Sequence, residues 1–142
     1  MRGQRPDLGA SFARLTRAMI EAETPILSAH GIEMWDYVVL AALESATVPS
    51  QSELATAVRR DKTRLIPILD RLEARRLLSR TPDPADRRNR VVALTDEGRA
   101  VFTACRKDIR EMEAKFLSSV PSAKRRTFLE VLEHLADDAP QG

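Results

Sequence analysis

The segment that most limits the possible fold is Asp83–Thr95, DPADRRNRVVALT. Short apolar runs flank its basic centre, at residues 77–78 before it and 91–94 after it. Apolar runs separated by a polar segment containing proline are typical of a β-hairpin. Three arginines lie at the predicted tip, namely Arg87, Arg88 and Arg90. Guanidinium groups on a projecting loop suit contact with phosphates or with a narrow DNA groove.

Two helical segments joined by a short turn come before the hairpin. Ser50 and Glu53 have the spacing of a capping box, which predicts a helix that begins at Ser50. Asp61 is a favourable N-cap for a second helix, predicted from Lys62 to about Leu78. The residues expected on the inward face of this helix are Leu65, Leu69 and Leu72. Pro67 is expected to loosen or bend its first turns.

Apolar residues also recur at helical spacing on both sides of this central segment. A first helix is predicted from Asp7, with Pro25 kinking or ending it and a break at residues 30–32. After the hairpin, a long helix capped by Thr95 and a last helix from Pro121 are predicted. The predicted fold is mainly α, a winged helix-turn-helix of about six helices plus a two-stranded wing hairpin.

These motifs together resemble the MarR family of bacterial transcription regulators. The wing signature of that family is D-x-R, five further residues and L-T, and the similar positions here are Asp86, Arg88, Leu94, Thr95 and Gly98. Ile32–Leu40 resembles the second helix of the family, and Ser50–Ala55 resembles the first helix of its helix-turn-helix. Arg76 stands where the family usually ends the recognition helix with glycine, which argues against a left-handed C-cap.

The first helix and the last two are amphipathic, and a winged helix needs few of them for its own core. Their apolar faces would bury each other across a two-fold axis, and the resemblance implies the same homodimer. We expect a single winged-helix domain over residues 1–142, with dimerisation helices at 7–29 and 96–138. The DNA-binding lobe is expected at 34–94, with the wing at 78–94. Three cations in the first turns of the last helix have no evident structural reason: Lys124, Arg125 and Arg126.

Charge distribution supports a nucleic-acid partner. The formal net charge is only +2, but residues 59–90 hold eleven Lys or Arg and five Asp or Glu. A basic middle in an otherwise acidic chain is typical of a DNA-binding face, although a solvated charged face is the alternative. By resemblance, Arg64 bonds guanine, Thr63 contacts thymine or phosphate, and Arg88 enters the minor groove, oriented by Asp86. The predicted DNA contacts are Ser50, Gln51, Lys62, Thr63, Arg64, Pro67, Arg71, Asp86, Arg87, Arg88 and Arg90.

Trp35 and Tyr37 have two interpretations, as core residues or as the wall of a small-molecule pocket. By resemblance, a pocket between the dimerisation helices and the DNA-binding lobe binds a small aromatic ligand, which would release an inverted-repeat operator from a repressor. The predicted ligand-binding residues are His30, Trp35 and Tyr37. Cys105, the single cysteine, is the only candidate for the alternative of a redox-responsive regulator. Its apolar stripe is typical of an inert, buried thiol.

An enzyme is the competing class, and the sequence lacks the G-x-G-x-x-G, P-loop and G-x-S-x-G motifs. His30 and His134 have no neighbour at metal-ligand spacing, so we expect neither a metal nor a cofactor. No apolar run approaches the length of a membrane span, and we expect the protein in the cytoplasm. A winged helix used only for protein contacts is a further alternative, against which the basic wing argues.

Overall fold

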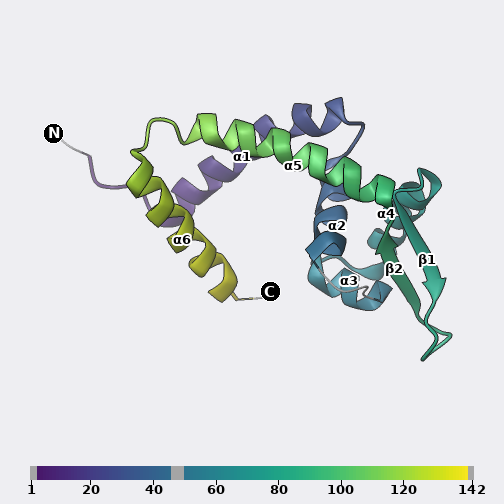
Figure 1. Cartoon of the computed structure of the whole chain (residues 1–142). Helices are drawn as coiled ribbons and strands as arrows, with labels where there is room; N and C mark the ends of the chain where they lie inside the picture. Colours follow the sequence, from purple (N-terminus) through teal and green to yellow (C-terminus); the bar gives the residue numbers. More distant parts are fainter. Residues whose placement is uncertain (1–2, 46–49, 141–142) are drawn as a thin grey trace. The chain divides into compact units, whose positions relative to one another are not determined.

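The structure is a computed structural model that describes residues 3–45 and 50–140 (Figure 1). The described residues form six α-helices and one two-stranded sheet: α1 Leu8–Ala29, α2 Met34–Ser45, α3 Gln51–Ala57, α4 Lys62–Ala74, β1 Leu78–Pro82, β2 Arg90–Leu94, α5 Asp96–Phe116 and α6 Ser122–Asp138. This confirms the predicted mainly α winged helix-turn-helix. The chain divides into two compact units, residues 1–108 and 109–142, with the boundary inside α5.

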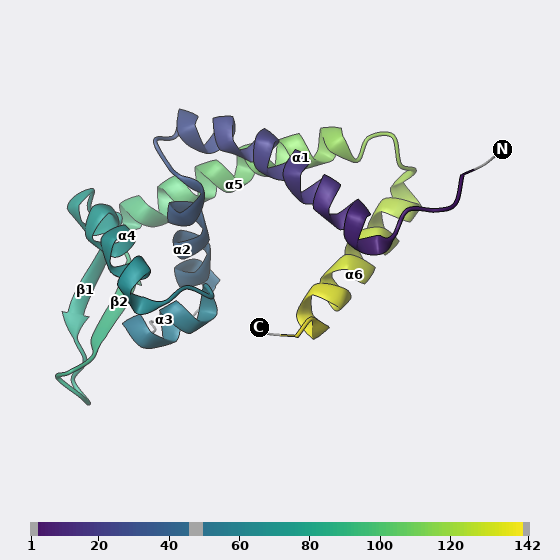
Figure 2. The ribbon, with the colours of Figure 1, turned by 180° about the vertical axis from the view of Figure 1, so that it is seen from behind.

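The predicted hairpin is confirmed. β1 pairs antiparallel with β2, in a register that sets Leu78 opposite Leu94 and Pro82 opposite Arg90. Leu78 and Val92 are buried, whereas the far end of β1 is exposed. Both views show the hairpin at the edge of the group formed by α2, α3 and α4, with its tip pointing away from them (Figures 1 and 2). The tip residues are therefore free to contact a partner.

Three helices begin where a polar side chain can accept the amide hydrogens of the first turn. Ser50 Oγ accepts from the Glu53 amide at 3.1 Å, and Asp61 Oδ1 accepts from the Arg64 amide at 2.9 Å. Thr95 Oγ1 accepts from the Gly98 amide at 2.9 Å. Each bond satisfies a donor that has no partner inside its helix, so these predicted helix starts are confirmed.

The recognition helix ends four residues earlier than predicted. α4 stops at Ala74 because Arg76 adopts a left-handed conformation, with φ of 60°. The Leu77 amide then donates to the Leu72 carbonyl at 3.0 Å, and the Arg76 amide donates to the Glu73 carbonyl at 2.9 Å. This is the Schellman arrangement, and the buried Leu72 and Leu77 accompany it. The expectation that α4 lacks a left-handed cap is therefore wrong. The arginine side chain still disfavours this conformation, at a cost of about 1–2 kcal/mol.

Neither internal proline ends its helix. α1 continues through Pro25 to Ala29, and α4 continues through Pro67. Packing on both sides of Pro67 outweighs the lost amide donor, because Leu65 and Leu69 are fully buried. α1 ends instead at the predicted break, where Gly31 has φ of 70° and the Ile32 amide donates to the Leu27 carbonyl at 2.9 Å.

The core of the first unit lies under the helix-turn-helix and the base of the hairpin. The predicted inward leucines of α4 are all fully buried, together with apolar residues of α2, α3 and β2: Val39, Leu40, Leu54, Leu65, Leu69, Leu72 and Val92. Burial of each such side chain contributes about 1.5–3 kcal/mol. This core holds α3, α4 and the hairpin on one frame.

Two helices expose apolar stripes. On α1, Leu8, Phe12 and Leu15 are between 39% and 63% exposed. On α6 none of the described residues is buried, and its exposed apolar residues are Phe128, Leu129, Val131, Leu132 and Leu135.

Within the described ranges no single helix is long and apolar enough to span a membrane. Only α1 and α2 taken together, as a pair bent by 84°, meet the same criteria of length and composition.

Candidate nucleic-acid interface

The amino end of α4 presents a short exposed polar surface. Lys62, Thr63 and Arg64 are exposed there because the inward positions of the helix are occupied by its leucines. The Arg64 side chain is 72% exposed, and its Nε lies 3.6 Å from an Asp61 carboxylate oxygen. An exposed pair of this kind holds the side chain only weakly. Arg64 can therefore extend toward a base edge or a phosphate.

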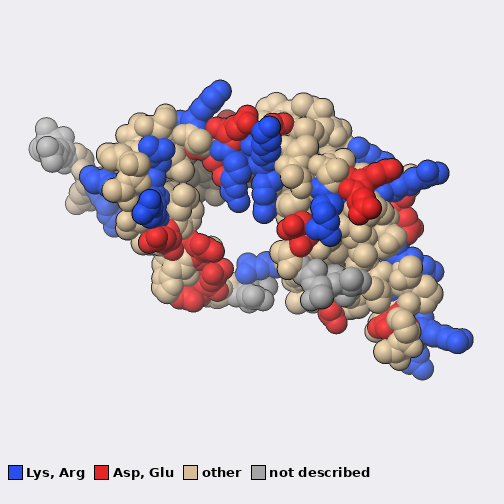
Figure 3. Space-filling view, in the orientation of Figure 1, with Lys and Arg blue, Asp and Glu red and all other residues tan. Residues whose placement is uncertain are grey.

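The wing tip carries exposed arginines on a folded turn. Arg87, Arg88 and Arg90 are all exposed, and Figure 3 shows basic side chains around the end of the hairpin. The Asp83 amide donates to the Asn89 carbonyl at 3.0 Å, which closes the turn. Asp86 Oδ1 accepts from the Arg88 amide at 3.0 Å. Asp86 thus fixes the backbone at Arg88, and the described contacts include no ion pair between the two side chains.

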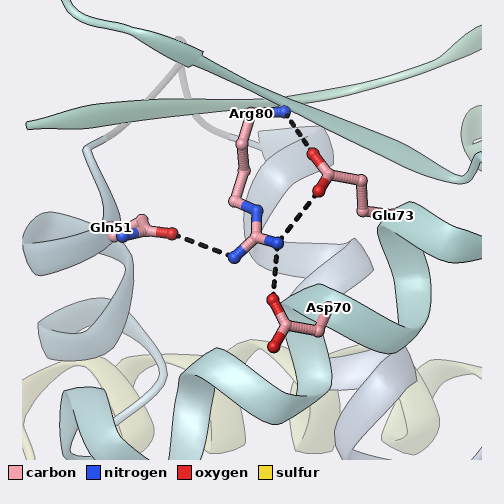
Figure 4. Close-up of polar contacts among 4 residues, drawn as sticks. All are labelled: Gln51, Asp70, Glu73 and Arg80. Carbon is pink, nitrogen blue, oxygen red and sulfur yellow. Dashed lines mark hydrogen bonds and ion pairs between the residues drawn. The ribbon is translucent and has the colours of Figure 1, made fainter.

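Arg80 on β1 is a functional candidate that the sequence prediction missed. Its guanidinium bonds three side chains from two helices, shown in Figure 4. The distances from the Arg80 nitrogens are 2.5 Å to Asp70 Oδ1, 2.9 Å to Glu73 Oε1 and 3.3 Å to Gln51 Oε1. The side chain is only 13% exposed. The hydrogen bond between the Arg80 and Glu73 side chains raises the pKa of Arg80 and lowers the pKa of Glu73. Strand alternation offered a signal, because Arg80 faces buried Val92 across the hairpin.

Three predicted DNA contacts have their polar groups engaged within the chain. The Ser50 hydroxyl caps α3, and Gln51 is buried against Arg80. Arg71 bonds the carboxylate of Asp36, and Arg71 Nη2 also lies 3.5 Å from a Glu33 oxygen. Asp36 is 1% exposed, and the hydrogen bond to it raises the pKa of Arg71. The sequence prediction did not single out Asp36, whose neighbours in the chain are mostly apolar.

Pro67 differs from those residues. It is exposed on α4, two positions from buried Leu65 and Leu69. It lacks a backbone donor, so any DNA contact it makes is apolar.

The predicted ligand-binding residues have different partners, which lie on α5 and in the turn between α3 and α4. His30 Nε2 lies 2.6 Å from Asp108 Oδ2 of α5. Tyr37 also faces α5, where its ring stacks on Phe102 at 5.4 Å and its hydroxyl accepts from Arg106. Trp35 is 36% exposed, so it is not a core residue, and the Arg60 guanidinium lies 3.8 Å from its ring centre. A cavity of about 300 Å³ lies elsewhere, on α1, and none of these three residues lines it.

Known proteins resemble this chain in sequence. A sequence profile of the MarR family matches residues 32–89. The transcriptional repressor NicR of Pseudomonas putida is 34% identical over 101 residues, which cover 71% of this chain and 64% of NicR. The chain belongs to the MarR family. The match spans just under two thirds of that relative's length.

Two solved structures extend the likeness of this MarR-family chain to its fold. The repressor CouR from Rhodococcus jostii, in a structure bound to a 23-mer DNA duplex, is 26% identical with a TM-score of 0.79, and 92% of each chain is covered. The regulator PcaV from Streptomyces coelicolor, in complex with its natural ligand, is 26% identical with a TM-score of 0.70. That alignment covers 97% of this chain and all of PcaV. These relatives are named as transcriptional regulators and not as enzymes.

The cysteine of this MarR-family chain is poorly placed for redox chemistry. Cys105 is fully buried in α5. Burial, followed by the charge of Asp108, raises the pKa of its thiol. The reactive species is the thiolate, so a thiol with a raised pKa reacts slowly at neutral pH. Among the described residues no group of three His, Cys, Asp or Glu side chains could hold a metal ion.

Proposed function

We propose that this chain is a transcription regulator that binds an inverted repeat in double-stranded DNA as a homodimer. In this proposal it acts as a repressor and leaves its operator when a small aromatic ligand binds. The observation that carries the proposal is that one hydrophobic core supports two exposed basic surfaces. The first comprises Lys62, Thr63 and Arg64 at the amino end of α4, and the second comprises the wing arginines. The DNA-bound state of CouR supports it.

The two surfaces would read DNA differently. The amino end of a recognition helix meets base edges in the major groove, where Arg64 can bond guanine and Thr63 can contact a thymine methyl group. Arg88 at the wing tip would enter a minor groove, flanked by Arg87 and Arg90 near phosphates. Ser50, Gln51 and Arg71 would contribute indirectly, because their side chains hold α3 and α4 in place.

DNA binding should depend steeply on salt. If binding releases about six condensed counterions, raising the salt concentration from roughly 50 to 200 mM should lower the affinity about a thousandfold. Footprinting should reveal half-sites about 10 bp apart.

Arg64→Ala should weaken binding to the operator by about 1–3 kcal/mol and binding to random duplex by much less. Fluorescence anisotropy with both duplexes measures this, with Arg99→Ala as the charge-matched control. Equal affinity for all duplexes at all salt concentrations would contradict the proposal.

The exposed apolar stripes of α1 and α6 support the homodimer. Each stripe would leave water when two copies associate, at about 25 cal/mol for each Å² of apolar surface buried. Light scattering at micromolar concentration should give twice 15.9 kDa. Leu132→Glu should shift the protein toward monomer, because it places a charge in the α6 stripe. Glu130→Gln, on the same helix, should leave the dimer intact. A folded wild-type monomer would overturn this assembly.

The ligand response is supported by the ligand-bound state of PcaV and by the exposed ring of Trp35. Trp35 is the only tryptophan, so its fluorescence reports on this region alone. Aromatic carboxylates such as salicylate should quench it and lower DNA affinity together. Linkage requires that bound DNA lower the affinity for the ligand by the same factor as the ligand lowers the affinity for DNA. A broad panel of compounds without effect on DNA affinity would favour a constitutive DNA binder.

A further inference from the structure

We propose that Arg80 is a positioning residue that sets the angle of the wing on the helix-turn-helix, so that Arg88 can reach DNA. This inference rests on the proposed DNA binding. It assigns a function to a residue that lies eight positions before Arg88 and outside the exposed basic surfaces. The geometry that carries it is the set of bonds from one side chain on β1 to α3 and α4.

The bonds of Arg80 fix the orientation of β1 relative to α3 and α4. The side chain bonds Asp70 and Glu73 on α4, and it also bonds Gln51 on α3 (Figure 4). The Arg80 amide donates to the second Glu73 oxygen at 3.1 Å, so both backbone and side chain are held by one carboxylate. A planar guanidinium that bonds several acceptors fixes an orientation, which an apolar side chain does not.

Among the described residues, the other contacts of the wing lie mainly at its base and along β2, where Leu78 and Val92 are buried. Among the residues that the structure describes, the sheet of the wing has two strands. Thr95 bonds the Leu77 carbonyl at the base of the hairpin, and one isolated bridge joins Val91 to Ser50. Beyond Arg80 the remaining β1 residues, Thr81 and Pro82, are exposed. Arg80 is therefore the last largely buried side chain of β1 before the tip. A small change in the angle of β1 at Arg80 would displace Arg88, at the far end of the hairpin, by a larger distance.

Arg80 is poorly placed to contact DNA itself. Its side chain is 13% exposed and its terminal nitrogens are bonded. The Asp70 and Glu73 side chains beside it are 59% and 41% exposed. Together the three groups carry a formal charge of −1, which would repel phosphate. A favourable effect of Arg80 on DNA binding would therefore act through the wing.

A double-mutant cycle tests this. Arg88→Ala should weaken operator binding about tenfold in the wild-type background and at most about twofold in Arg80→Met. Arg80→Met keeps an unbranched side chain of similar length but loses the guanidinium. The operator affinity of Arg80→Lys should fall between those of the wild type and Arg80→Met. Arg99→Met is the matched control, because Arg99 is 56% exposed and lies 3.7 Å from Glu44. Its cycle with Arg88→Ala should be additive. Additivity of Arg80→Met with Arg88→Ala would overturn the positioning role.

A second measurement needs no DNA, so it separates failure of this inference from failure of the proposed function. A spin label on Ala85→Cys reports motion of the wing tip, because Ala85 is exposed while Cys105 is buried from the reagent. Arg80→Met should increase the mobility of the label, and Arg99→Met should not. Unchanged mobility would overturn the inference even if DNA binding is confirmed. If Arg80→Met does not fold, Glu73→Gln tests the same contact and should mobilise the label.

Discussion

Replacing Gly98 with alanine is expected to lower the free energy of unfolding by about 3 kcal/mol or more. A Cβ added at Gly98 would lie 1.8 Å from the Leu77 carbonyl oxygen and 2.8 Å from its carbon. That carbonyl cannot move cheaply, because it also accepts from the Thr95 amide at 3.2 Å and Leu77 closes the cap of α4. The first turn of α5 must therefore separate from the base of the wing.

Thermal unfolding followed by circular dichroism measures this effect, and we expect Tm to fall by roughly 10 °C. Gly9→Ala is the matched control, because nothing lies within 4 Å of a Cβ built there and the residue is exposed on α1. Alanine at a helical surface position should stabilise by up to about 1 kcal/mol. Equal Tm values for the two variants would show that α5 can shift away from Leu77 at little cost.

Arg71→Ala is expected to destabilise the fold by about 3 kcal/mol. The substitution leaves the carboxylate of Asp36, which is 1% exposed, with only the Glu33 amide at 3.0 Å as a partner in the described contacts. An uncompensated buried charge is costly, although the 42% exposure of the Arg71 side chain lets water replace part of the pair. The double variant Asp36→Leu/Arg71→Met should recover much of the loss, since neither residue then leaves a buried charge.

Urea unfolding gives the free energies, provided that the slope with denaturant is unchanged. The control is Arg64→Ala on the same helix, whose partner Asp61 is 61% exposed at 3.6 Å. Loss of that exposed pair should cost about 0.5 kcal/mol or less. If Arg71→Ala were equally mild, water would have to reach Asp36 in the variant, and Arg71 would be free for the DNA contact predicted from the sequence.

Local features of this chain were predictable from the sequence by itself. The caps at Ser50, Asp61 and Thr95 and the inward leucines of α4 act over three to seven residues, so spacing alone reveals them. The wing followed from apolar runs around a basic turn, and the exposure of Lys62, Thr63 and Arg64 followed from helical periodicity. These elements were enough to indicate the family and the two surfaces proposed to bind DNA.

Tertiary structure alone decided which polar groups remain available. Arg71 pairs with Asp36, which lies 35 positions earlier in the chain. Arg80 bonds Gln51, which lies 29 positions earlier, and so connects α3 to the wing. Arg76 takes a left-handed conformation that its own side chain disfavours, because burial of Leu72 and Leu77 at the end of α4 outweighs the local cost. Gly98 is required by the Leu77 carbonyl of a distant turn. Such contacts depend on how helices and hairpin pack together, and no spacing along the chain encodes which residues then meet.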